Sequence, residues 1–257
     1  MMKNRYSWFL CLVFFSAVEA QEATPGGALD WFNQGVELAR NGEHRAALVR
    51  FERARAISPA WALPYIEIAT CHMLLGNDKQ LVEENLKKAV QLGPEMPRAH
   101  YLYGIFLQDN GDIKQAISEF VQALKLRPSL TDARFRLALL YLEQGRQPQA
   151  LEQLEFVVQQ SPNHLGARKN LALLYEQTGQ LEEAEKHLKA MCDFLPESAF
   201  HLEQLAKFYE RAGMKAKASA ARRQLEKLDN QRDRKMRPLL PSRDISGTRR
   251  ENPQPPG

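Results

Sequence analysis

A repeat of 34 residues constrains this chain more than any other feature of its sequence. Aligning the 257 residues at that spacing superposes six glycines and five prolines. One step in each series is 35 residues, because a single extra residue lies between Gly76 and Pro94. A period of this size is typical of solenoids, in which each unit buries its apolar face only against its neighbours. We therefore expect one elongated array rather than a globular core. The aligned residues are Gly42, Gly76, Gly111, Gly145, Gly179 and Gly213, and Pro59, Pro94, Pro128, Pro162 and Pro196.

Each unit has the pattern of two helices joined by a tight turn. The first unit predicts helices over residues 29–40 and 44–56. The turn at Gly42 stops the first helix, and the second helix stops ahead of Pro59. Glycine adopts the left-handed backbone at low cost, and the residue before a proline disfavours helix. A small residue recurs where the two helices of a pair would approach most closely, because a large side chain there would hold them apart. These small residues are Gly35, Ala69, Gly104, Ala138, Ala172 and Ala206.

This pattern resembles the signature of tetratricopeptide repeats: an aromatic, a Leu-Gly pair, a Tyr, then Ala, a large apolar residue, Ala and Pro. The resemblance covers about residues 28–228 and implies an all-α fold, a right-handed superhelical solenoid of about six helix-turn-helix repeats with a C-terminal cap helix. The second repeat departs from the signature at Val82 and Leu86, and the sixth has Arg222 at an apolar position, as a polar terminal cap would. The first repeat supplies Trp31, Gly35, Ala47, Phe51, Ala54 and Pro59.

The sequence divides into four segments. Residues 1–20 are expected to be a signal peptide, 21–27 a flexible lead-in, 28–228 the solenoid, and 229–257 a disordered tail that is basic and rich in proline. Within the solenoid the repeats cover approximately 28–61, 62–96, 97–130, 131–164, 165–198 and 199–228.

The N-terminus has the pattern of a secretory signal. Lys3 and Arg5 precede an apolar run over residues 8–17, and Val18 and Ala20 are the small residues that a signal peptidase requires. We expect cleavage after Ala20. Because a membrane-spanning helix needs about 20 apolar residues, an uncleaved anchor is the less favoured alternative.

Export and the absence of a disulfide framework favour the bacterial periplasm. Exported proteins that resemble this chain serve envelope complexes for motility, pili or export, or assembly of the outer membrane and cell wall. Two classes of function remain open: a scaffold subunit of such a complex, or a chaperone-like carrier that shields an apolar client segment. Partners are therefore expected among other proteins of the cell envelope.

The sequence lacks the motifs of an enzyme or a metal site. It has no Gly-rich phosphate loop, no HExxH pair, no close cysteine pair and no GxSxG elbow. His187 and Cys192 are five residues apart, which does not place them on one helix face. Cys71 and Cys192 are expected to be too far apart for a disulfide. We therefore predict no catalytic residues, no metal and no cofactor.

The resemblance implies that the first helix of each pair lines a concave groove in which partners bind. We compared two positions of the first helix, one turn apart, between repeats. Through four repeats these positions are apolar or aromatic, and toward the C-terminus they become polar at Lys169, Glu203 and Lys207. Such a groove would suit an amphipathic helix or an extended apolar segment. The alternative is that these side chains pack between neighbouring repeats. The predicted groove residues are Phe32, Val36, Ile66, Thr70, Tyr101, Ile105, Phe135 and Leu139.

The C-terminal region is basic. Residues 215–237 hold nine Lys or Arg and three Asp or Glu, which could give weak contact with an anionic surface and would weaken as salt is raised. A solvating cap and tail explain the same charges. The net charge of +4 for the whole chain is too small to indicate nucleic acid, and no nucleic-acid partner is expected.

Overall fold

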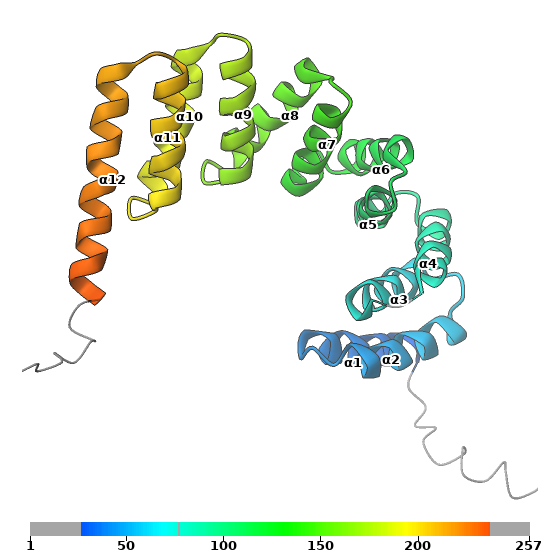
Figure 1. The fold of residues 1–257 in the computed structure, drawn as a ribbon. Coiled ribbons are helices and arrows are strands. Elements are labelled where there is room, and N and C mark those ends of the chain that lie inside the picture. The colour runs from blue at the N-terminus through cyan, green and yellow to red at the C-terminus, as the bar shows by residue number, and fades with distance from the viewer. Residues whose placement is uncertain (1–26, 77, 237–257) are drawn as a thin grey trace, which may run out of the picture. The chain divides into compact units, whose positions relative to one another are not determined.

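The computed structural model describes residues 27–76 and 78–236, and this part of the chain contains twelve α-helices and no strand (Figure 1). The predicted signal peptide, most of the lead-in and residues 237–257 lie outside it. The all-α prediction is confirmed. The helices are α1 (Ala28–Arg40), α2 (His44–Ile57), α3 (Ala62–Leu75), α4 (Lys79–Leu92), α5 (Pro97–Asp109), α6 (Ile113–Leu126), α7 (Thr131–Glu143), α8 (Gln147–Gln160), α9 (Leu165–Gln177), α10 (Leu181–Phe194), α11 (Ala199–Arg211) and α12 (Lys215–Met236).

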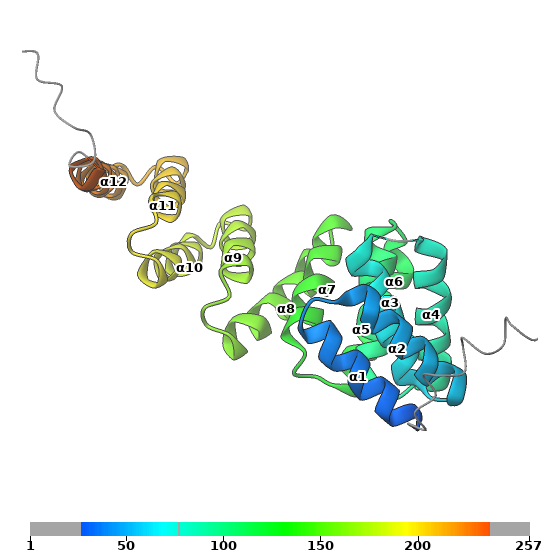
Figure 2. The same cartoon turned by 90° about the horizontal axis from the view of Figure 1, so that it is seen from below.

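The chain forms two compact units whose boundary lies within α8, between Gln153 and Leu154. In unit 1, α1 packs on α2, α3 on α4 and α5 on α6, and each pair also contacts the next. In unit 2, α9 packs on α10 and α11 on α12 in the same manner, as both views of the ribbon show (Figures 1 and 2). Contacts between helices that are consecutive in sequence therefore build both units, as expected of a solenoid.

The turn glycines adopt the backbone that the repeat predicts. All six have positive φ, from 65° at Gly76 to 83° at Gly111. At Gly111 the preceding helix α5 ends at Asp109, and the Asp112 side chain accepts a hydrogen bond from the backbone of α6. The left-handed residue therefore reverses the chain between the two helices of a pair.

The small residues at the helix crossing are also confirmed as points of close approach. A Cβ atom added to Gly104 would lie 2.7 Å from the ring of Phe120, and one added to Gly35 would lie 2.6 Å from the ring of Phe51. Both rings are fully buried. Where the facing residue is smaller, as at Leu86 in the second repeat, the aligned small residue is alanine instead. The size of one residue thus sets the size of its partner.

A recurring hydrogen bond ties each of four interrepeat loops to the helix that follows. In each, the side chain six residues after the closing proline contacts that proline's carbonyl oxygen. We call this contact a loop tie. The four loop ties are Tyr65 Oη to Pro59 O at 2.9 Å, His100 Nε2 to Pro94 O at 3.0 Å, Arg134 Nε to Pro128 O at 2.9 Å, and Arg168 Nε to Pro162 O at 2.6 Å.

The last helix is longer than predicted. α12 continues to Met236, so the tail boundary placed after Leu228 is wrong for residues 229–236. No proline or glycine interrupts the chain before Pro238, and Arg232 Nη2 donates to the backbone carbonyl of Glu197 at 2.6 Å, which holds this turn against the preceding loop. Arg222 is exposed and its Nε lies 2.8 Å from Glu210, in agreement with a polar cap.

Candidate functional site

The predicted groove residues lie on α1, α3, α5 and α7, all within unit 1. On each helix the two predicted positions are four residues apart and so share a face. Figure 1 shows α3, α5 and α7 following one another, with α4 and α6 on the other side of them. We call this surface the odd-helix face. Six side chains remain half-buried on it: Val36, Thr70, Tyr101, Ile105, Phe135 and Leu139.

Two predicted groove residues are core residues instead. Ile66 is 0% exposed and packs with Ala89 and Ala99. Phe32 is 9% exposed, and its ring lies 5.4 Å from Phe51 and 4.7 Å from Trp61 between ring centroids. Burial at these two positions stabilises the fold and leaves no surface for a partner. For them, the alternative of packing between repeats is correct.

The half-buried side chains of the odd-helix face differ in the contacts that they can make with a partner. The ring of Tyr101 lies 6.0 Å from that of Phe120, so it is supported from below by the core. Thr70 donates its hydroxyl to the carbonyl of Ile66 at 2.8 Å, which leaves its methyl group as an apolar contact. Preorganised aromatic side chains of this kind lose little conformational entropy when they bind.

Polar contacts across the odd-helix face hold neighbouring first helices together. Arg98 on α5 makes a two-point ion pair with Glu67 on α3, with Nη2 to Oε2 at 3.0 Å. Arg136 on α7 donates to Gln108 on α5 at 3.2 Å. Such paired groups fix the spacing of the helices and with it the spacing of the apolar side chains between them.

The odd-numbered helices expose further apolar side chains that the two aligned series omit. Leu29 on α1 is 59% exposed and Leu74 on α3 is 61% exposed. Both lie near helix ends, one turn or more beyond the positions that were compared between repeats. A search for large apolar residues in the first or last turn of the first helix of a repeat would have predicted both side chains.

The prediction of a polar face in the C-terminal repeats is incomplete. Glu203 and Lys207 do pair, with Nζ to Oε1 at 2.8 Å. Yet Leu173 on α9 is 49% exposed and Phe200 on α11 is 54% exposed, and both border a small cavity in unit 2. Apolar side chains are therefore accessible in unit 2 as well.

His187 and Cys192, the two residues considered for catalysis, both lie on α10. The His187 ring is buried, stacks on Tyr175 at 5.7 Å between centroids, and faces Arg168 at its Nδ1 atom. Burial lowers the pKa of His187, and the charges of Arg168 and Lys186 lower it further. Burial raises the pKa of the Cys192 thiol, so the thiolate that a nucleophile needs is disfavoured.

Burial acts on the pKa of the other cysteine in the same direction. Cys71 is buried, and burial together with Glu67 raises its pKa to about 11. Cys71 and Cys192 are free thiols, as predicted. Within residues 27–76 and 78–236, no three His, Cys, Asp or Glu side chains come close enough to hold a metal ion.

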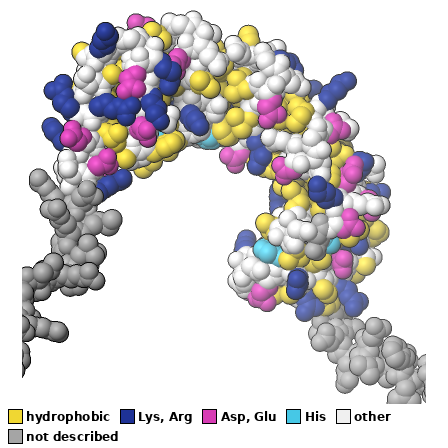
Figure 3. Space-filling model, in the orientation of Figure 1, with side chains coloured by type: hydrophobic (Ala, Val, Ile, Leu, Met, Phe, Trp, Pro, Cys, Tyr) yellow, Lys and Arg dark blue, Asp and Glu magenta, His cyan; other side chains and the backbone are white. Residues whose placement is uncertain are grey.

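Internal partners occupy part of the basic C-terminal region. Lys217 pairs with Glu185 at 2.6 Å and Arg222 with Glu210, while Arg223 and Arg232 donate to backbone carbonyls. Figure 3 shows Lys and Arg side chains lying beside Asp and Glu over α11 and α12. This pairing favours the solvating cap over a dedicated anionic-surface site. Among the helices described, none is both long enough and apolar enough to cross a membrane.

Comparison with known proteins agrees with this architecture. The tetratricopeptide repeat family model matches residues 107–155 and 141–205. Residues 107–205 therefore match the tetratricopeptide repeat family, and the fold of the chain is that of a tetratricopeptide repeat solenoid. No curated protein sequence matches it at a significant level.

Several solved structures share the fold. PilF of Pseudomonas aeruginosa is 19% identical, with a TM-score of 0.65 over 78% of this chain and 91% of PilF. PilW, described as a widely conserved type IV pilus biogenesis factor, is 21% identical, with a TM-score of 0.61 over 77% and 92%. YrrB, described as having an unusual peptide-binding site, is 23% identical, with a TM-score of 0.59 over 73% and 96%.

Proposed function

We propose that this tetratricopeptide repeat protein is a non-catalytic scaffold that binds another protein through the odd-helix face of unit 1. The observation that carries the proposal is the row of half-buried apolar and aromatic side chains that continues from α1 to α7. A partner's apolar helix or extended segment could bury these side chains further, and aromatic residues would supply most of the binding energy.

The setting we propose is the bacterial periplasm, within an envelope complex of the motility, pilus or export type. The sequence pattern of a secretory signal over residues 1–20 supports export. The shared fold of PilF and of the pilus biogenesis factor PilW supports an envelope complex, and the peptide-binding site of YrrB supports recognition of a peptide segment.

The test changes Tyr101 to Lys and Phe135 to Glu in one chain. Placing two charges on the odd-helix face should abolish capture of the partner while circular dichroism shows an intact fold, because charges buried against an apolar segment are strongly unfavourable. Partners are identified by cross-linking in the cell envelope from a photoreactive residue at Ile105. Capture that persists unchanged would show that the odd-helix face is not the binding surface.

A matched control carries the same type of substitution outside this face. Val49 on α2 is 51% exposed and Leu126 on α6 is 41% exposed. Changing Leu126 to Lys and Val49 to Glu adds the same two charges on even-numbered helices, and this variant should retain the partner. Loss of capture in both double variants would indicate a general effect of charge rather than a defined surface.

A second candidate is a chaperone-like carrier that shields an apolar client. Exposed Leu29 and Leu74 beside the odd-helix face favour it, because contiguous exposed apolar surface can accept many sequences. Stoichiometry distinguishes the two. A scaffold co-purifies with a fixed set of envelope proteins in constant ratio, whereas a carrier captures many unfolded clients weakly.

A further inference from the structure

The loop ties of three repeats continue into the second helix of the pair. The side chain that contacts the closing proline also contacts a residue nineteen positions later in the chain. His100 Nδ1 lies 2.7 Å from Glu119, Arg134 Nη1 donates to Gln153 at 2.7 Å, and Arg168 Nη1 lies 3.4 Å from His187. A cationic or polar side chain thus joins the loop, the first helix and the second helix in each of these repeats.

The sixth repeat lacks both members of this arrangement. Leu202 stands six residues after Pro196, and Ala221 stands nineteen residues after Leu202. Among the described residues, no side chain donates to the carbonyl of Pro196; Arg232 reaches the next carbonyl, that of Glu197, instead. The side chains that occupy this place in other repeats are therefore replaced by short apolar ones.

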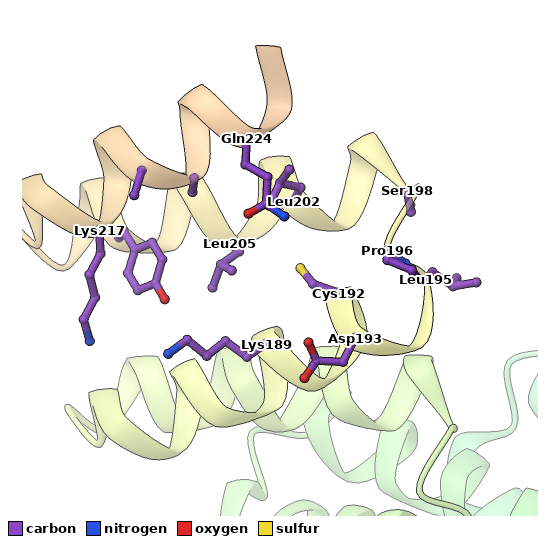
Figure 4. A pocket seen from close by; sticks show the side chains of 13 residues that line it. Lys189, Cys192, Asp193, Leu195, Pro196, Ser198, Leu202, Leu205, Lys217 and Gln224 are labelled. Atoms are coloured by element: carbon purple, nitrogen blue, oxygen red, sulfur yellow. The ribbon is translucent and has the colours of Figure 1, made fainter. Parts of the chain in front are cut away.

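A cavity of about 520 Å³ lies at this place in unit 2, between α10, α11 and α12 (Figure 4). Leu202, Leu205 and Ala221 line it together with Pro196. Its volume lies within the range of ligand pockets in proteins. The cavity is thus the space that an arginine or histidine occupies in the preceding repeats.

Asp193 supplies the cavity with a carboxylate. Its carboxylate lines the cavity at the end of α10, where the two preceding repeats have Gln159 and Lys125. Two lysines also line the cavity, but both are held by one buried carboxylate: Lys189 and Lys217 pair with Glu185 at 2.7 and 2.6 Å. Asp193 has no such partner among the described residues and is exposed at the edge of the cavity.

We propose that this cavity binds an arginine side chain of a partner protein. The guanidinium would donate to the Pro196 carbonyl, as Arg134 and Arg168 do to their own prolines, and would pair with Asp193. A planar group with five donors suits these two acceptors better than a lysine ammonium, because it can bond both at once. This site is separate from the odd-helix face, and its test does not depend on that proposal.

The test uses the full chain and N-acetyl-arginine N-methylamide as the probe. NMR titration should shift the methyl signals of Leu202, Leu205 and Ala221, and the lysine analogue of the probe should bind about ten-fold more weakly. Changing Asp193 to Asn should also weaken binding about ten-fold. Changing Glu182 to Gln, an exposed carboxylate of α10 outside the cavity, should leave it unchanged.

A variant that fills the cavity from within gives the decisive comparison. In Leu202→Arg the new side chain should complete the missing loop tie and abolish probe binding, with circular dichroism confirming the fold. Equal affinity for the two probes, no shift with either, or undiminished binding to Leu202→Arg would overturn the proposal. So would tighter probe binding after Arg243, Arg249 and Arg250 are changed to Gln, because the chain's own tail would then be the occupant.

Discussion

The pairing of Gly104 with Phe120 gives the sharpest test of how this chain packs its helices. In the change Gly104→Ala, the added Cβ atom would lie 2.7 Å from one ring carbon of Phe120 and 2.8 Å from another. Contacts this short do not occur in folded proteins, so α5 and α6 must separate or the fully buried ring must move.

The expected magnitude follows from two opposing effects. Alanine in the interior of a helix is favoured over glycine by about 1 kcal/mol. Overpacking a well-filled core costs about 1–3 kcal/mol. Because the Phe120 ring is 0% exposed and has no solvent into which to move, we take the upper part of that range. Gly104→Ala should therefore lower the free energy of unfolding by about 1–2 kcal/mol.

The double variant Gly104→Ala, Phe120→Leu should recover most of this loss. This variant gives the third repeat the alanine and leucine that the second repeat has at the equivalent positions, Ala69 and Leu86. Phe120→Leu alone should destabilise by about 1 kcal/mol, because it leaves a small cavity beside Gly104. The coupling between the two sites should then be about 2 kcal/mol and favourable.

Urea unfolding followed by circular dichroism measures all four members of this cycle. Ala69→Gly is the matched control, because it removes a methyl group where the facing residue is Leu86, and it should destabilise by about 1 kcal/mol. If Gly104→Ala stabilises the chain as an ordinary helix substitution would, or if the coupling is near zero, the steric argument fails.

Two further predictions concern stability. Burial raises the pKa of Glu185, but hydrogen bonds from Lys189, Lys217 and Tyr209 outweigh it and hold this pKa at about 2, well below the ordinary value of 4.5. The contribution of ionised Glu185 to stability is therefore present above about pH 4.5 and lost as the pH falls toward 2. The stability difference between wild type and Glu185→Gln, measured in urea melts, should shrink over that interval. Gly111→Ala should destabilise by about 1 kcal/mol in the same assay although open space surrounds the site, because φ is +83° there; an unchanged midpoint would refute this.

The features that could be predicted from the sequence are those that recur in every repeat. A glycine such as Gly111 is required by the local backbone, and a small residue such as Gly104 by one neighbouring helix. Such requirements act within a single repeat and are repeated at a fixed period. The family, the helix pairs and the points of close approach therefore follow from the sequence alone.

The features that could not be predicted depend on neighbouring repeats. Ile66 and Tyr101 occupy the same aligned position, yet Ile66 is fully buried and Tyr101 is half-buried. The difference arises because Ile66 packs against Ala89 and Ala99 of the next helices, and no period reports how closely those helices approach. The end of α12 is of the same kind, since the contact of Arg232 with the loop at Glu197 supports turns that composition assigned to a tail.

Some departures from the repeat pattern are matched by a second change that keeps the core filled, and others are not. At the helix crossing of the first five repeats, glycine faces phenylalanine and alanine faces leucine, so a change in one member is matched in the other and the core stays filled. At the loop tie of the sixth repeat, Leu202 and Ala221 are both apolar and shorter than the side chains they replace, and a cavity borders them. The chain therefore leaves this place open to a side chain from outside it. An uncompensated pair beside the one carboxylate in this series, Asp193, is the pattern expected where a partner supplies the missing side chain.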